Sequence, residues 1–349
     1  MVIALNNKRG TMLRKKRVLT ATVLWGIQLY ASVSAASPLT ITPFQTANRS
    51  PLVQVFGLPP IESAMVLGSS RSEGRLSLDI ANNFVNKSNA HESLLLDGES
   101  YRLSLLIRYG LGNNFEAGME LPFVGQGGGV FDSFIEGWHD FFGLPQGGRK
   151  DSPRNRLLYR YAKDGTVRLN VDDSGFGLGD IRLTGGYQLY HDGTPHPRAV
   201  ALRGSLKLPT GSSGQLHGSG STDTALWLTA SDDYGMPIGH ITLMGAAGGM
   251  AMSRGDVITD QQRPVVGFAS LGLGWAPSDW IAFIFQCYGH TPFYQGSSLD
   301  SLSASSLQLH SGGTLRLPGA VLLDIAVSED IAVDTAPDVT LHISLRRQF

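Results

Sequence analysis

The chain has 349 residues, of which 43 are glycine and only one is cysteine, and its formal net charge is −1. After the N-terminal region it contains no run of about 18 uninterrupted apolar residues, which excludes a transmembrane helix in the mature protein. The lone Cys287 excludes an intramolecular disulfide, and its place on an apolar face predicts a small packing residue.

Residues 1–35 have the organisation of a secretory signal peptide. Basic residues between Lys8 and Arg17 precede a mostly apolar stretch, Val18 to Val33, and the small residues that end at Ala35 offer a cleavage site. Met12 is an alternative start, and an uncleaved membrane anchor is the alternative to cleavage. Cleavage removes six basic residues and leaves 22 basic against 29 acidic ones, a net charge of −7 that argues against a nucleic-acid partner.

Residues 36–74 lack a regular pattern. Prolines interrupt them repeatedly, and Asn48 to Pro51 predicts a turn. We expect a lead-in segment ahead of the first regular strand. The alternative is that Leu52–Phe56 and Ser63–Leu67 add two short strands.

From residue 75 onward, apolar and polar residues alternate with a period of two, which predicts strands with one apolar and one polar face. The predicted strands are Arg75–Phe84, Tyr101–Tyr109, Phe115–Phe123, Ile181–Leu189, Val200–Leu208, a strand through Leu226 and Leu228, Gly239–Met250, Val265–Trp275, Trp280–Tyr288, Leu307–Leu317, Val321–Val327 and Val339–Phe349.

The connections alternate between long loops, beginning with the polar stretch Asn86–Glu99, and short turns. Short periplasmic turns and longer extracellular loops are typical of transmembrane barrels, and closure removes exposed strand edges. The predicted fold is therefore an all-β, antiparallel transmembrane β-barrel of about twelve strands over residues 75–349. Residues 36–74 then form a periplasmic lead-in that tucks into the barrel mouth, or they raise the strand number to 14.

Side-chain placement along these strands agrees with a barrel. Aromatic residues such as Tyr109, Phe115, Trp275 and Trp280 flank the short turns, as expected of an interfacial girdle. Charges of both signs follow the polar faces, which suits a hydrated or salt-bridged lumen. The residues predicted to line it are Arg102, Arg108, Glu116, Glu120, Asp180, Arg182, Arg203, Lys207, Gln286, His310, Arg316, His342 and Arg346.

The last predicted strand, Val339–Phe349, alternates strictly and ends on an aromatic residue. It resembles the C-terminal strand of Gram-negative outer-membrane barrels, although Arg347 stands at an outward position that is usually apolar or aromatic. The resemblance implies that Phe349 is an assembly signal, that the barrel assembly machinery and outer-membrane lipids are partners, and that the protein resides in the outer membrane after cleavage near Ala35.

An insertion at residues 124–177 interrupts the strand pattern. Its aromatic and aliphatic residues recur at helical spacing and predict an amphipathic helix: Phe131, Phe134, Ile135, Trp138, Phe141 and Phe142. This helix is either a lid, plug or interfacial element, or it packs a loop domain onto the rim, which is the favoured interpretation. Basic residues follow that could pair with lipopolysaccharide phosphates or could form a solvated loop: Arg149, Lys150, Arg154 and Arg156. Leu157–Tyr161 and Thr166–Asn170 then predict a protruding hairpin.

Several blocks together are similar to an uncharacterised family of the Gram-negative envelope, the domain of unknown function DUF3187. They are Asn48–Leu52, Phe56–Pro59, Phe134–Pro145, Leu157–Tyr161, Gly177–Leu183, Leu206–Gly211 and Gly218–Asp223. The resemblance spans nearly the whole mature chain. It implies export and a barrel but no known activity.

No residue pattern supports an enzyme. His342 and Ser344 share one strand face, which does not make a triad, and no nucleophile elbow is present. Glu136, His139 and Asp140 form a solvated helical face more readily than a metal site. We therefore predict no catalytic residue, metal or cofactor. A channel or a transporter of small solutes or hydrophobic compounds is the first hypothesis; the alternatives are a structural or lipopolysaccharide-binding protein and a lipid-modifying enzyme.

Overall fold

The computed structural model describes residues 38–129, 155–331 and 335–349. The predicted signal peptide and the predicted helix around Trp138 lie outside these ranges. Among the helices of the described residues, none is long and apolar enough to cross a membrane.

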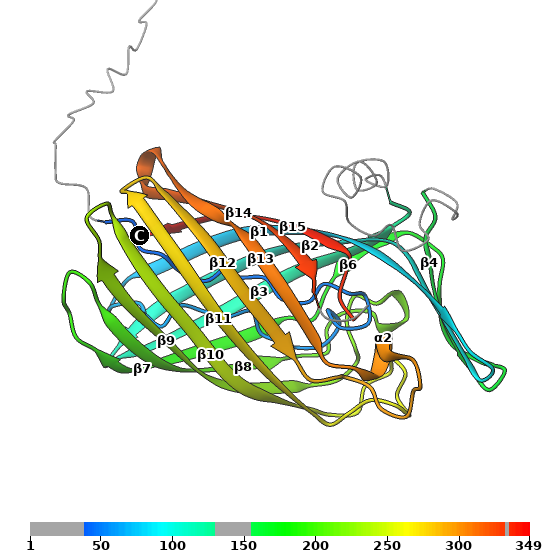
Figure 1. Cartoon of the computed structure of the whole chain (residues 1–349). Coiled ribbons are helices and arrows are strands. Elements are labelled where there is room, and N and C mark those ends of the chain that lie inside the picture. Colours follow the sequence, from blue (N-terminus) through cyan, green and yellow to red (C-terminus); the bar gives the residue numbers. More distant parts are fainter. Residues whose placement is uncertain (1–37, 130–154, 332–334) are drawn as a thin grey trace, which may run out of the picture. The chain divides into compact units, whose positions relative to one another are not determined.

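Twelve antiparallel strands close into a barrel, because each pairs with two neighbours and β15 returns to β1 (Figure 1). This confirms the predicted fold class. The barrel strands are β1 (Ser72–Ser88), β2 (Glu92–Gly112), β3 (Phe115–Gly127), β7 (Arg182–His191), β8 (Arg198–Lys207), β9 (Asp223–Gly235), β10 (His240–Met252), β11 (Val265–Ser278), β12 (Ile281–His290), β13 (Ser306–Leu317), β14 (Val321–Asp330) and β15 (Val339–Gln348).

Shorter elements stand beside the barrel strands. β4 (Leu158–Lys163) and β5 (Thr166–Val171) form the predicted hairpin, which pairs with the first residues of β2. β6 (Gly175–Leu178) pairs with the end of β3. The helical turns are η2 (Ser213–Gln215), α2 (Asp300–Ser303) and η3 (Pro318–Ala320).

The barrel is apolar outside and polar inside. Leu271 is 74% exposed on β11, whereas Arg203 on β8 is only 1% exposed. Beside the short turns, Tyr109, Trp275 and Trp280 are exposed, as the predicted girdle requires. Since a soluble β-protein places its apolar face inside, this inverted distribution is that of a sheet surrounded by lipid.

The prediction of a long loop at Asn86–Glu99 is wrong. β1 and β2 continue through these residues as a paired hairpin up to Ser88 and from Glu92, with only residues 89–91 between them. Leu94 and Leu96 alternate within the stretch and are buried against Tyr159 and Tyr161 of β4. Polar neighbours hid this alternation, and the β4 hairpin supplies the partner that stabilises the extension.

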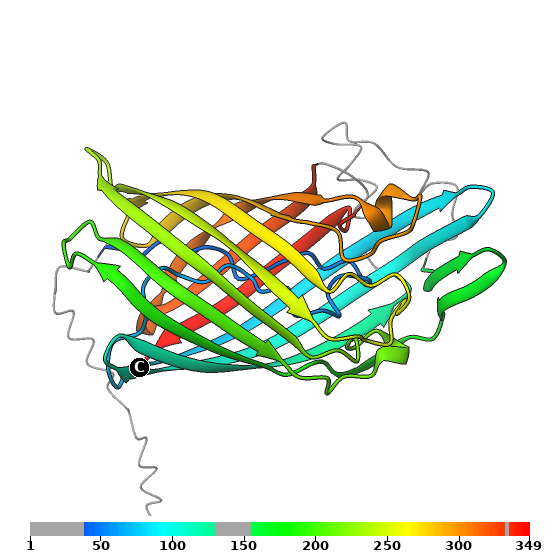
Figure 2. The same ribbon diagram turned by 90° about the horizontal axis from the view of Figure 1, so that it is seen from below.

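Residues 38–71 form no strand, so the two extra strands of the 14-strand alternative are not present in the described structure. Instead the segment runs through the barrel interior, where Figure 2 shows it as the blue trace between the strands. Every residue from 41 to 62 is buried. We call residues 38–71 the plug, with a first limb (38–49), an apex (50–58) and a second limb (59–71).

Candidate functional site: the plug inside the barrel

The first limb enters at the end of the barrel that carries the short turns and runs toward the long loops. Along this path its backbone carbonyl oxygens and amides form hydrogen bonds with side chains of the barrel wall. Arg316 at the end of β13 donates to the Pro38 carbonyl at 3.2 Å. The Phe44 amide donates to Gln286 Oε1, halfway along β12, at 3.0 Å.

At the far end of the first limb, Asn48 is the anchor. Its Nδ2 donates to the Thr335 carbonyl at 2.9 Å and lies 2.9 Å from His290 Nε2, where β12 ends. The Asn48 Oδ1 accepts from the Ser50 amide at 2.9 Å and so starts the turn of the apex. The predicted turn at Asn48–Pro51 is therefore present, but it lies inside the barrel.

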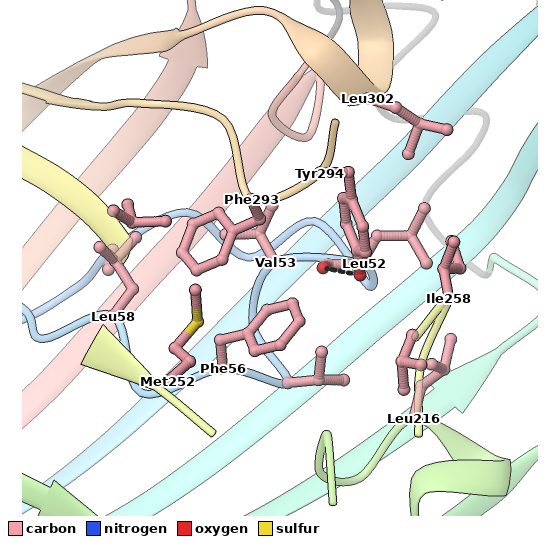
Figure 3. Packing of buried hydrophobic residues seen from close by; sticks show 14 of the residues in the cluster. Leu52, Val53, Phe56, Leu58, Leu216, Met252, Ile258, Phe293, Tyr294 and Leu302 are labelled. Atoms are coloured by element: carbon pink, nitrogen blue, oxygen red, sulfur yellow. Dashed lines mark hydrogen bonds between the residues drawn. The ribbon is translucent and has the colours of Figure 1, made fainter. Parts of the chain in front are cut away.

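The apex is held mainly by apolar packing. Phe56 stacks on Phe293 with ring centroids 5.0 Å apart and meets Tyr294 edge-on. Leu52 and Leu58 belong to the same buried cluster, and Tyr294 donates its hydroxyl to the Leu52 carbonyl at 2.9 Å (Figure 3). The long loops supply much of this cluster, including Leu216, Ile258 and Leu302. The apex is thus sealed beneath the loops.

The second limb returns to the short-turn end. Tyr288 donates to the Pro59 carbonyl at 2.9 Å, and Arg203 donates to the Ser63 carbonyl at 2.6 Å. Gln188 brackets the next turn by donating to the Ala64 carbonyl and accepting from the Val66 amide, each at 2.8 Å. Wall side chains thus satisfy backbone groups that have no ladder partner, as a buried irregular segment requires.

The plug has only two charged residues between Pro38 and Ser70, and both pair with the wall. Arg49 lies 2.8 Å from Asp79 of β1, whose other oxygen lies 2.6 Å from His342 Nδ1. Glu62 lies 3.2 Å from Arg203. A buried charge without a partner is costly, so the two pairs fix both limbs across the lumen.

The wall also pairs charges within itself. Arg108 donates to Glu73 at 2.6 Å and to Glu116 at 3.0 Å, and Glu116 also contacts Arg203. Glu116 in turn accepts from the Leu67 amide at 2.6 Å. The wall network therefore continues into the plug.

Glycines on the inner face make room for the plug. A Cβ at Gly274 of β11 would lie 2.4 Å from Ile41 Cγ2, and one at Gly110 of β2 would lie 2.0 Å from the Gly68 carbonyl oxygen. Both clashes are too close for any ordinary contact. The wall is shaped around this segment. A cavity of about 310 Å³ remains at the short-turn end, between both limbs and the β7–β8 turn, β9 and β10.

The thirteen residues predicted to line the lumen fall into three groups. Eleven are buried: Arg108, Glu116, Glu120, Asp180, Arg182, Arg203, Lys207, Gln286, His310, His342 and Arg346. Arg102 is nearly buried, with its side chain 11% exposed, and pairs with Glu120 at 3.0 Å. Arg316 is half-buried at the short-turn end. Their facing an open lumen stays a prediction, because many of them contact the plug or one another.

Of the basic residues considered for lipid phosphates, Arg149, Lys150 and Arg154 lie outside the described residues. Arg156 is described and donates to Asp97 at 2.7 Å. The helix residues Phe131, Phe134, Ile135, Trp138, Phe141 and Phe142 also lie outside, as do Glu136, His139 and Asp140. Phe349 closes the sheet by donating its amide to the Ser72 carbonyl at 2.9 Å, and its role in assembly stays a prediction.

Sequence reasoning missed Arg49 and Glu62 as interior charges. The available signal was composition: a stretch of 33 residues with two charges and many apolar residues does not suit a solvated periplasmic linker. Their partners lie 30 and 141 positions away, so spacing along the chain could not identify them.

Comparison with known proteins agrees with this architecture. The family of proteins of unknown function DUF3187 matches residues 19–349. The fold is similar to that of an outer-membrane channel from Pseudomonas putida F1, with a TM-score of 0.51, 12% identity, and coverage of 81% of this chain and 97% of that one.

Two further solved structures are similar at lower scores. The NanC porin has a TM-score of 0.41 and 10% identity over 78% of this chain and 98% of that one. The toluene transporter TbuX of Ralstonia pickettii has a TM-score of 0.29 and 11% identity over 81% and 90%. No curated protein sequence matches. At such identities the likeness concerns the fold alone.

Proposed function

We propose, from the premise that this chain belongs to the DUF3187 family and is an outer-membrane β-barrel, that it is a gated channel for small hydrophilic solutes whose closed state has the plug in the lumen. One observation carries the proposal. Residues 41–62 are buried in the lumen, but their backbone bonds to wall side chains, as at Phe44 and Pro59, and not to a sheet ladder that would make the segment part of the wall.

The size of the barrel supports this reading. Eight strands enclose a space that side chains can fill, whereas wider barrels leave room for a ligand, a channel or a plug. Here a covalently attached segment fills the space. Once it moves, the exposed wall carries charges of both signs, such as Arg203, Glu116 and Lys207, which favours hydrated solutes over apolar ones.

Water can replace the contacts of the two limbs. A hydrogen bond between protein groups contributes only about 0.5–1.5 kcal/mol net, because water competes for the same donors and acceptors. Release of a limb exchanges these polar contacts for solvent, and in the first limb it also exposes a small apolar cluster around Leu39, Ile41 and Phe44. This cluster is smaller than that of the apex, so the limbs are the more displaceable part of the plug.

The test is single-channel conductance in planar bilayers, with heat-modifiable gel mobility as the check on folding. We expect the mature protein to be mostly silent and a variant lacking residues 38–66 to conduct in discrete steps. A folded deletion variant that is as silent as the parent would contradict a channel and favour a structural role.

A disulfide offers a reversible version of this test. The Cβ that Gly274 would carry lies 3.5 Å from the Ile41 Cβ, within the range of disulfide geometry. In a Cys287→Ser background, Ile41→Cys with Gly274→Cys should lock the first limb when oxidised and release it when reduced. Equal conductance in both redox states would show that the first limb does not gate the barrel. Ile41→Cys alone is the matched control, because Gly274→Cys alone would press against the Ile41 side chain.

A further inference from the structure

A cluster of two histidines and one carboxylate lies at the short-turn end of the barrel, beside the cavity under the first limb. His196 comes from the turn between β7 and β8, Asp233 from the end of β9, and His240 from the start of β10. One ligand atom of each lies within 4.8 Å of the others, and within the described residues this is the only group of three such side chains.

The contacts of His240 indicate which of its two ring nitrogens carries the proton and which has the lone pair. Its Nε2 lies 3.0 Å from the Leu39 carbonyl oxygen of the plug. A carbonyl can only accept, so Nε2 carries the proton and the neutral ring has its lone pair on Nδ1. That lone pair points at Asp233 Oδ1, 2.7 Å away. At this distance only a proton fits between the two acceptors, so a metal ion would take the place of that proton once the two atoms separate.

The other contacts of the Asp233 carboxylate bring in a second histidine and a hydroxyl group. Asp233 Oδ2 lies 2.7 Å from His196 Nδ1, and the Thr242 hydroxyl donates to Oδ1 at 2.5 Å. A carboxylate steadied by a hydroxyl, with an imidazole whose second nitrogen donates to a carbonyl, is the outer-shell arrangement of metal-binding residues.

We propose that His196, Asp233 and His240 bind a divalent transition-metal ion of the zinc class, and that this ion holds the first limb of the plug through His240 and the Leu39 carbonyl. Two imidazoles and a carboxylate suit such an ion and leave a fourth position for water. The latch, but not the binding site, rests on the proposed gating function.

The geometry allows the ion to enter. Zinc–ligand bonds of about 2.0–2.1 Å place tetrahedral ligand atoms about 3.4 Å apart, so each nitrogen–oxygen pair must widen by roughly 0.7 Å. The His196 side chain is 43% exposed and lies in a turn, so it can move away from Asp233. The side chains of Asp233 and His240 are each 9% exposed, and their pair must widen by small side-chain rotations. The exposed histidine is also the path from solvent.

Binding is measured by titrating zinc into the untagged mature protein in detergent against a chromogenic chelator. We expect one equivalent in the wild type and at least tenfold weaker binding in His196→Ala and in Asp233→Asn. The matched control is His91→Ala, since His91 is an exposed histidine 3.3 Å from Asp164 with no second histidine in the described structure. Absence of saturable one-to-one binding, or binding by His196→Ala as tight as in the wild type, overturns the site.

The latch has its own readout, the amide hydrogen exchange of residues 39–42 and 44. Zinc should slow this exchange at least tenfold in the wild type and leave it unchanged in His196→Ala. Zinc binding without slower exchange overturns the latch while the site stands. Because neither measurement depends on conduction, a silent plug-deleted barrel would contradict the channel without affecting this result.

Discussion

The apex and the limbs of the plug are held by different forces. At the apex, Leu52, Phe56 and Leu58 are buried among apolar side chains of the long loops. Along the limbs, backbone groups bond to polar wall residues, and two ion pairs cross the lumen. The first limb adds a smaller apolar cluster, in which Leu39, Ile41 and Phe44 pack on the wall. Water can replace hydrogen-bond partners, but it cannot replace the contacts of buried apolar side chains. Most limb contacts can therefore be exchanged for solvent, whereas the larger apolar cluster anchors the apex.

The largest expected effect comes from the limb side, at Arg203. Arg203→Ala removes one of the two arginines shared by the buried Glu62 and Glu116. Loss of one member of a buried ion pair costs about 3–5 kcal/mol, and we expect the lower end of that range because Arg108 stays 3.7 Å from Glu62 and 3.0 Å from Glu116. We expect that loss in the free energy of local opening, read from hydrogen exchange of residues 59–67. The control is Arg198→Ala on the same strand, where an exposed arginine lies 2.9 Å from Asp232. Equal exchange in both variants would mean that Arg203 does not hold the second limb.

On the apex side, Leu52→Ala removes apolar packing but leaves the backbone bond from Tyr294 possible. Truncation of a buried leucine costs about 2–5 kcal/mol, depending on how far the site collapses. Exchange of residues 52–56 should rise accordingly, and added salt should not restore protection, because no charge is involved. Leu271→Ala on the lipid-facing side is the control. If added salt changed the exchange of residues 52–56 in this variant, charged contacts would hold the apex as they hold the limbs.

An intermediate effect is expected from a wedge against the first limb. Gly274→Val puts carbon where Ile41 now lies, and overpacking of this kind costs about 1–3 kcal/mol. The open probability of the channel should rise, and Ile41→Ala in the same protein should reverse part of the rise by returning the space. Gly204→Val on β8 is the control, since a Cβ there has only ordinary contacts beyond 3.5 Å. Additive effects of the two substitutions would argue against a direct contact.

The smallest effect is expected when a single hydroxyl group is removed at the apex. Tyr294→Phe removes one hydroxyl that donates to the Leu52 carbonyl and keeps the ring against Phe56. The expected cost is about 0.5–1.5 kcal/mol in local opening at the apex, measured by hydrogen exchange with exposed Tyr190→Phe as control. A cost as large as that of Leu52→Ala would show that polar contacts, and not packing, hold the apex.

Much of the barrel could be predicted because its rule is local. Strand residues alternate between lipid and interior. The outer face can therefore be predicted from residues such as Leu271 and Leu273. The inner face can be predicted from Arg182 and Arg203, without knowledge of any partner strand. The prediction failed at Asn86–Glu99, where the extension of β1 and β2 depends on a hairpin more than 60 residues further along the chain. The predicted helix around Trp138 remains a prediction.

The barrel, the aromatic girdle and the polar inner face could be predicted from the sequence, because each follows from the residue pattern along single strands. The path of residues 38–71 depends instead on the closed barrel. These residues have no periodic pattern. Their partners lie on strands and loops up to 287 positions away and come within reach only when β15 closes onto β1. The same closure and strand order assemble His196, Asp233 and His240 beside the Leu39 carbonyl. A site built from turns and strand ends on three elements leaves no motif in the chain, since the sheet, and not the spacing, sets its geometry.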